Sequence, residues 1–116
     1  MAQLDRDKVR NQFDQAVNMT AAQIEKWLRT RESKAVGWKG EDGKSSRESV
    51  GHASGRHVAR ILRKSPDSLT DDDYAHMRKV VSYVHRHSAQ RPDNIHTSRW
   101  RYSLMNWGHD PAREES

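Results

Sequence analysis

The amino-acid sequence predicts an all-α fold: a small bundle of four to five short helices with a long polar loop that contains glycines. Apolar residues recur at helical spacing in several segments, and residues that cap helices precede those segments. No strand-like alternation of apolar and polar residues runs for more than a few positions. The chain has 116 residues, 33% apolar and 32% charged, so we expect one domain over residues 1–111 with a small core. This length excludes a multi-domain enzyme.

The first expected helix covers residues 4–17. Its apolar residues are few and loosely spaced, so we expect it to be lightly anchored: Leu4, Val9, Phe13, Ala16 and Val17. The second helix has a clearer start, because Thr20 and Gln23 have the spacing of a capping box. Ile24, Trp27 and Leu28 form its apolar stripe.

A long polar loop is expected over residues 32–47. Glycines recur there at spacing three, and the apolar residues Val36 and Trp38 are isolated among lysines and serines. No helix has enough apolar residues in this segment to be anchored, so we expect a flexible loop.

The third helix is expected from Glu48 or Ala53 to Lys64, and Ser65 before Pro66 stops it. Its apolar face is formed by Val50, His57 or Val58, Ile61 and Leu62. Gly51 and Gly55 lie four residues apart and destabilise a helix unless something packs closely against the backbone. An indole ring from the C-terminal helix is the expected neighbour.

The fourth helix has the strongest start signal of the chain. Thr70 is the expected N-cap, Leu69 can pack back onto the helix, and the carboxylates of residues 71–73 favour its N-terminal dipole. An apolar stripe then extends to about His87 and consists of Tyr74, Met77, Val80, Val81 and Val84.

The last helix is expected over residues 98–107 and should end at Gly108 in a left-handed cap. Its aromatic and leucine side chains are interpreted as core residues rather than as a platform for stacking bases: Trp100, Tyr102, Leu104 and Trp107. Residues 112–116 are expected to be a disordered tail.

The formal net charge is +5, and the positive charge is concentrated in two segments. In the third helix Arg56, Arg60, Arg63 and Lys64 lie on one face, away from its apolar residues. The following helix adds Arg78, Lys79 and Arg86, and the loop adds Lys39, Lys44 and Arg47. Such a surface neutralises phosphates, so these ten residues are the candidate nucleic-acid contacts, with DNA favoured over RNA.

Two other interpretations of the basic helices stay open. A basic helical face can simply be the solvated side of an amphipathic helix. It can also belong to an interaction module, a regulatory adaptor that docks on an acidic protein partner. The sequence does not fix the oligomeric state.

Catalytic, metal and cofactor sites are not predicted. The chain has no cysteine, which excludes disulfides, thiolate catalysis and cysteine-containing zinc sites. Its seven histidines lack ligand spacing, and helix capping accounts for the acidic triplet at residues 71–73. The glycines of the loop lack the spacing of a nucleotide-binding P-loop. No apolar run is long enough to span a membrane, so we expect a cytoplasmic protein, nucleoid-associated if it binds DNA.

Several long runs of the sequence resemble a bacterial and fungal family catalogued as domain of unknown function 3140. The runs span about residues 17–111 and comprise Val17–Thr20, Ser49–His52, Ser54–Arg56, Leu69–His87, Ala89–Pro92 and Arg99–Pro111. Members of the family are sometimes labelled DNA-binding, so the resemblance implies DNA binding. It carries no catalytic residues over to this chain.

Overall fold

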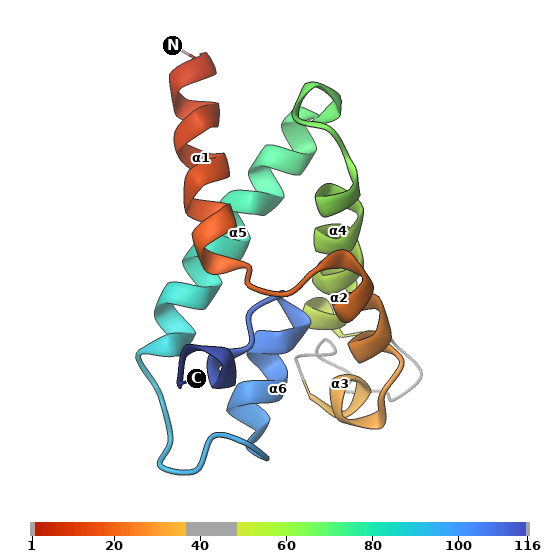
Figure 1. The fold of residues 1–116 in the computed structure, drawn as a ribbon, viewed down its shortest axis with the longest axis vertical. Coiled ribbons are helices and arrows are strands. Elements are labelled where there is room, and N and C mark those ends of the chain that lie inside the picture. Colours follow the sequence, from red (N-terminus) through yellow and green to blue (C-terminus); the bar gives the residue numbers. More distant parts are fainter. Residues whose placement is uncertain (1, 37–48, 116) are drawn as a thin grey trace.

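A computed structural model describes the backbone of residues 2–36 and 49–115, and the side chains of residues 5–36 and 49–113 (Figure 1). The α-helices are α1 (Ala2–Ala16), α2 (Ala21–Leu28), α3 (Arg31–Ala35), α4 (Val50–Arg63), α5 (Asp71–Ser88) and α6 (Arg99–Asn106). Two 3-10 helices, η1 (Pro66–Ser68) and η2 (Pro111–Glu115), follow α4 and α6. The described residues contain no strand, so the predicted all-α fold is confirmed.

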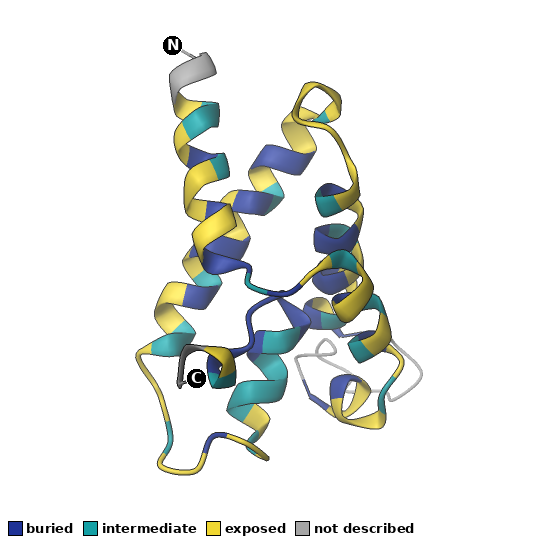
Figure 2. Ribbon diagram, in the orientation of Figure 1, coloured by how far each residue is buried: buried dark blue, intermediate teal, exposed yellow. Residues whose placement is uncertain are grey.

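The helix α5 crosses the molecule, with α1 packed along one side of it and α4 on the other (Figure 1). The helix α2 covers α4, and α6 lies below them in contact with α2, α3, α4 and α5. Side chains from all the longer helices form one core cluster between these elements, and Figure 2 marks the buried segments of each helix. The most deeply buried apolar residues include Phe13, Ile24, Val58, Val80 and Leu104.

The starts predicted at Thr20, Thr70 and Ser98 are correct, whereas α1 begins at Ala2 rather than residue 4, and α4 begins at Val50 rather than at Glu48 or Ala53. Thr20 and Thr70 both form complete capping boxes, in which the threonine hydroxyl accepts a backbone N–H and the N3 side chain accepts the threonine N–H. Ser49 and Ser98 cap α4 and α6 through their hydroxyl groups. The end of the last helix is also as predicted, because Gly108 has a φ of +89°.

The helix α1 is anchored by polar and cation–π contacts in addition to its few apolar residues. Val9 and Phe13 are buried in the core. Arg6 pairs with Asp71 at the start of α5, and its guanidinium lies 4.8 Å from the centre of the Tyr74 ring. A cation over an aromatic ring adds stabilisation to the packing of the two helices.

The segment predicted as a loop from residue 32 begins with a helix. Thr30 caps α3 by accepting the N–H of Ser33 at 3.1 Å. Ser33 and Val36 are completely or almost completely buried. A five-residue helix has no room for an apolar stripe, so periodicity could not reveal it. The rest of the predicted loop, residues 37–47, lies outside the described residues.

Two smaller predictions were wrong. Val50 was assigned to the apolar face of the third helix, but it is 49% exposed, and Gly51 is buried in its place. The tail after Pro111 was expected to be disordered, but residues 111–115 form η2. Asp110 accepts the N–H of Ala112 at 3.0 Å, and Arg113 donates to the Asn18 carbonyl at 2.5 Å.

The connections α1–α2 and α6–η2 meet in the middle of the fold. The carbonyl of Gly108 accepts the N–H groups of Asn18 and Met19 at 3.1 and 3.3 Å. The Asn18 amide donates to the Asp110 carbonyl at 3.0 Å and accepts the Asp110 N–H at 2.7 Å. His109 bonds through Nδ1 to the Ala16 carbonyl at 2.7 Å. These bonds join the beginning and the end of the chain.

Candidate nucleic-acid interface

The predicted contact residues that the structure describes lie on α4, at its C-cap Lys64 and on α5, and these two helices run antiparallel. Contacts between side chains establish the direction, because His57 meets Asp73 whereas Ser54, earlier on α4, meets His76, later on α5. The two helices therefore form a helical hairpin closed by η1. Its inner side faces the core, and its outer side is the candidate interface.

Asp73 is the centre of a polar cluster at the closed end of this hairpin. Its carboxylate accepts His57 Nε2 at 2.8 Å, Lys64 Nζ at 2.7 Å and the Thr70 N–H at 3.0 Å. Burial alone would raise the pKa of Asp73, but the hydrogen bonds from Lys64, Thr70 and His57 together hold it well below its usual range. The carboxylate is thus charged and fully bonded, which fixes the end of α4 to the start of α5.

His76 lies beside this cluster and is neutral at physiological pH. Burial lowers its pKa to about 4, and the neighbouring His57 acts in the same direction. The rings of His57 and His76 stack at 4.3 Å, and Ser54 Oγ lies 2.8 Å from His76 Nε2. The hydroxyl satisfies one nitrogen of a ring that burial keeps uncharged.

A row of stacked rings continues from His76 along α5. Trp107 lies 6.0 Å from His76 and 4.3 Å from Tyr83, and His87 lies 5.0 Å from Tyr83. Trp100 closes the row, 6.4 Å from His87, and donates its indole N–H to the His87 carbonyl at 2.6 Å. Trp107 and Leu104 belong to the core and Trp100 packs against it, as predicted, but Tyr102, also predicted as core, is only half-buried and lies outside the core cluster.

Arg56 and Arg60 project from the outer side of α4. They are one turn apart, about 6 Å along the axis, and both are exposed. Arg60 follows His57 by about one turn of α4, so it lies at the edge of the contact between α4 and α5. Within the side chains described, no carboxylate pairs with Arg60.

Arg63 and Lys64 are held by carboxylates. Arg63 makes a two-point contact with Glu25 of α2, with N–O distances of 2.6 and 3.1 Å. Lys64 binds Asp73, as described above. The continuous stripe predicted for the third helix is therefore split, because its last two cations are drawn to opposite sides of α4 by its neighbours.

The cations of α5 lie on two sides of that helix. Lys79 and Arg86, two turns apart, are on the side nearest α4, and Arg86 donates to the Ser82 carbonyl at 3.4 Å. The positive charge of Lys79 contributes to the lowered pKa of His76, which places it near that ring. Arg78 follows Tyr74 by one turn and therefore lies toward α1.

We call Arg56, Arg60, Lys79 and Arg86 the cationic face. These four exposed residues lie on the outer side of the α4–α5 hairpin. The other predicted contacts on these helices are not part of this face. Arg63 and Lys64 are paired with carboxylates, and Arg78 lies toward α1. Lys39, Lys44 and Arg47 lie outside the described residues.

The cluster of Ser54, His57, Asp73 and His76 brings together residue types found in hydrolytic enzymes. Sequence reasoning missed it, because Ser54 and Asp73 come from different helices. The hydrogen bonds run in two separate pairs, Ser54 with His76 and His57 with Asp73, rather than in one relay. Ser54 is only 3% exposed, and none of the cavities described below is lined by these four residues.

No group of three or more histidine, aspartate or glutamate side chains among the described residues is placed to hold a metal ion. No helix in the described part of the chain is both long and apolar enough to cross a membrane.

The fold and the surface define a small, entirely helical protein whose central hairpin carries a basic outer face. The chain belongs to the family described as a protein of unknown function (DUF3140), whose profile matches residues 12–105. The match covers α2 to α5 and almost all of α6, and therefore includes the whole cationic face. Searches of curated proteins and of solved structures find no match.

Proposed function

We propose that this protein binds nucleic acid, DNA in preference to RNA, through phosphate contacts from the cationic face. The observation that carries the proposal is the arrangement of Arg56, Arg60, Lys79 and Arg86 on one side of a rigid helical hairpin. Arg60 and Lys79 have no carboxylate partner among the described side chains, so their charges are available to a ligand. Contacts to phosphate give affinity without base recognition.

The polar cluster beneath the face supports this role by holding the hairpin together. Asp73 joins the end of α4 to the start of α5 through His57 and Lys64. Because the negative charge of Asp73 is satisfied inside the protein, it weakens the positive field of the outer surface only slightly. Phosphate contacts are more effective from such a fixed scaffold than from mobile side chains on a loop.

The test is a fluorescence-anisotropy titration of a labelled 20-base-pair duplex at several salt concentrations. If four phosphates are neutralised, log Kd against log salt has a slope of about 3.6 in magnitude, so affinity falls roughly 150-fold between 50 and 200 mM salt. Replacing Arg60→Glu together with Lys79→Glu should abolish binding at 100 mM salt. A single-stranded RNA of equal length should bind more weakly.

The matched control is Lys8→Glu with Arg29→Glu, which changes the net charge equally at exposed positions on α1 and at the C-cap of α2. We expect this variant to retain binding within a few-fold. Equal losses in the two double variants would show that only net charge matters, and the absence of binding at 50 mM salt would contradict the proposal outright.

An adaptor that docks on an acidic protein is the second candidate. A specific observation favours it: Val50 is 49% exposed at the edge of a cavity of about 260 Å³ that Tyr83, Trp107 and Arg86 also line. Protein interfaces combine such an apolar centre with a charged rim. A partner that stays bound to the purified protein after nuclease treatment would favour this function over DNA binding.

A further inference from the structure

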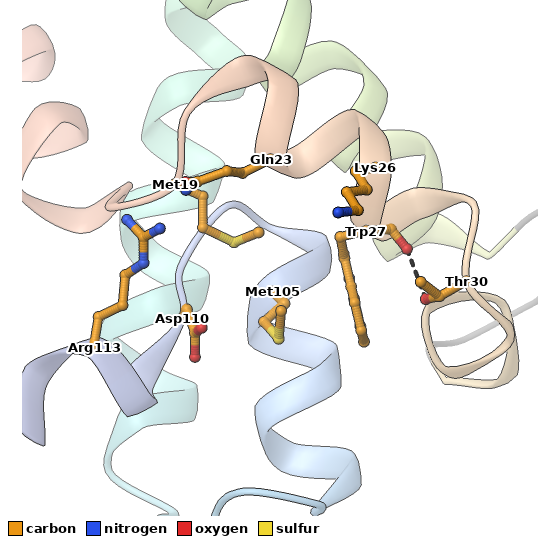
Figure 3. A pocket seen from close by; sticks show the side chains of 8 residues that line it. All are labelled: Met19, Gln23, Lys26, Trp27, Thr30, Met105, Asp110 and Arg113. Atoms are coloured by element: carbon orange, nitrogen blue, oxygen red, sulfur yellow. Dashed lines mark hydrogen bonds between the residues drawn. The ribbon is translucent and has the colours of Figure 1, made fainter.

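A second hollow lies between α2, α6 and η2 (Figure 3). It is open to solvent, has a volume of about 290 Å³ and is lined by Met19, Gln23, Lys26, Trp27, Thr30, Met105, Asp110 and Arg113. None of these residues belongs to the cationic face, so the hollow is a separate site. Its volume is near the lower end of the range for ligand pockets, which begins at roughly 300 Å³, and suits one large side chain.

The walls of the hollow are apolar, and one of them is fixed. Trp27 donates its indole N–H to Asn106 Oδ1 at 2.7 Å, and its ring lies 5.4 Å from that of Tyr102. Met19 and Met105 lie on the same side of this fixed ring in Figure 3 and line the hollow with it. Methionine side chains are flexible and polarisable, so they adapt to guests of different shape.

The charges around the hollow favour a negatively charged guest. Lys26 and Arg113 stand on opposite sides of the methionines in Figure 3. Asp110 is the one carboxylate among the lining residues, and Arg101 neutralises it through contacts of 3.0 and 3.1 Å. Arg113 is held at the rim by the Asn18 carbonyl, and Lys26 makes no ion pair with a described side chain.

We propose that this hollow is a docking site for an acidic peptide segment of a partner protein, one with a bulky apolar side chain between aspartates or glutamates. The apolar side chain, leucine, methionine or phenylalanine, enters between Trp27 and the two methionines. The flanking carboxylates meet Lys26 on one side and Arg113 on the other. An apolar anchor surrounded by charge-complementary contacts is a recurrent arrangement in peptide recognition.

The first experiment selects binders from a displayed library of random seven-residue peptides, using the full-length protein as bait. We expect the selected peptides to share a leucine, methionine or phenylalanine with an acidic residue within two positions on each side. A consensus that lacks acidic residues, or is basic, would overturn the proposal, as would the absence of any selected sequence.

The second experiment places the peptides in the hollow. A labelled selected peptide should bind at least tenfold more weakly to Met105→Glu, which puts a charge among the apolar walls. Lys26→Glu, an exposed change that leaves the core intact, should weaken binding several-fold and should affect an analogue with asparagine and glutamine much less. Arg60→Glu on the cationic face is the control and should leave the affinity unchanged.

The experiments distinguish a failure of the hollow as a peptide-docking site from a failure of the cationic face as a nucleic-acid interface. If peptide binding survives both Met105→Glu and Lys26→Glu, the hollow is not the docking site, whatever the outcome of the DNA titration. If the DNA duplex displaces the labelled peptide and Arg60→Glu weakens it, the peptide occupies the cationic face and the proposal is wrong.

Discussion

Gly55 marks the place where α4 comes closest to the rest of the chain. A Cβ atom at this position would lie 2.5 Å from the Asn106 carbonyl oxygen and 2.8 Å from a methyl group of Leu28. The oxygen belongs to the backbone of α6 and cannot move aside without shifting that helix. The small residue expected from the sequence is thus required by a backbone contact, together with the close approach of an indole at Gly51.

Gly55→Ala should lower the free energy of unfolding by about 2 kcal/mol or more, because overpacking outweighs the gain of about 1 kcal/mol in helix propensity. Gly51→Ala is the matched control on the same helix. There the added atom would lie 3.1 Å from Trp107 Nε1, a side-chain atom that can yield. Urea denaturation should therefore show Gly51→Ala to be much closer to neutral; equal effects of the two changes would contradict this account.

Only some residues of the candidate site could be placed correctly from the sequence. Helical spacing placed Arg56 and Arg60 together on the outer side of α4, and the structure agrees. The same spacing grouped Arg63 and Lys64 with them, but Glu25 and Asp73 pair with these two cations. Such partners lie on other helices, 38 and 9 residues away, and a periodic pattern within one helix carries no information about them.

Among the elements, the helices with apolar stripes and capping residues were predictable. The Thr70 capping box and the apolar stripe of α5 were identified because each signal is local. The helix α3 was missed because its stability comes from contacts with α6 rather than from an apolar periodicity. Its one local signal is Thr30, a residue type preferred at N-caps, whose hydroxyl accepts the backbone N–H of Ser33.

Asn106 connects three helices through one buried amide. Its Oδ1 accepts Trp27 Nε1 at 2.7 Å and Ser33 Oγ at 2.5 Å, and its Nδ2 donates to the Ser33 carbonyl at 3.1 Å. The residue is completely buried, so water cannot replace these partners. A single polar residue of α6 thereby fixes both α2 and α3, a role that no hydrophobic pattern could predict.

Asn106→Ala should reduce the free energy of unfolding by about 3–5 kcal/mol, because it leaves several buried polar groups without partners and opens a cavity. Asn94→Ala, at an exposed position before α6, should change stability by less than about 0.5 kcal/mol. Chemical denaturation followed by circular dichroism measures both. A loss below 1 kcal/mol for Asn106→Ala would show that the amide does not hold the helices together.

At the scale of the whole molecule, pH should act on stability in two stages. His76 has a pKa lowered to about 4 in the folded protein by burial and by His57, against about 6.5 when unfolded. The unfolded chain therefore binds the proton first, and stability falls as the pH drops from about 6.5 toward 4. Burial lowers the pKa of His87 in the same direction. Protonation of Asp73 destabilises the fold only below about pH 4.

The loss attributable to His76 between pH 7 and pH 5 should be on the order of 1 kcal/mol, because the ring is only partly buried and solvent screens part of the effect. Urea denaturation at the two pH values gives the difference directly. His76→Gln should reduce this difference, and His85→Gln, at an exposed position, should not. A variant lacking His76 with an unchanged pH dependence would contradict the assignment.

The net charge of +5 also has a different meaning once the fold is known. Part of the positive charge is paired within the fold, since Arg63, Lys64 and Arg101 each neutralise a carboxylate. The cationic face keeps its charge on one side of the hairpin. The distribution of charge, which composition alone cannot give, therefore distinguishes a binding surface from a uniformly basic protein.

The bonds that join Asn18 to Asp110 and Ala16 to His109 have a consequence for how the protein is made. They connect positions 92 and 93 residues apart, so neither can form until the last helix has left the ribosome. At roughly 5–20 residues per second, α1 and α2 wait about 5–20 seconds for these partners. During that time the exposed core residues of α1, among them Phe13, are surfaces that a chaperone can hold, and the native contacts form only after residues 108–110 have been made.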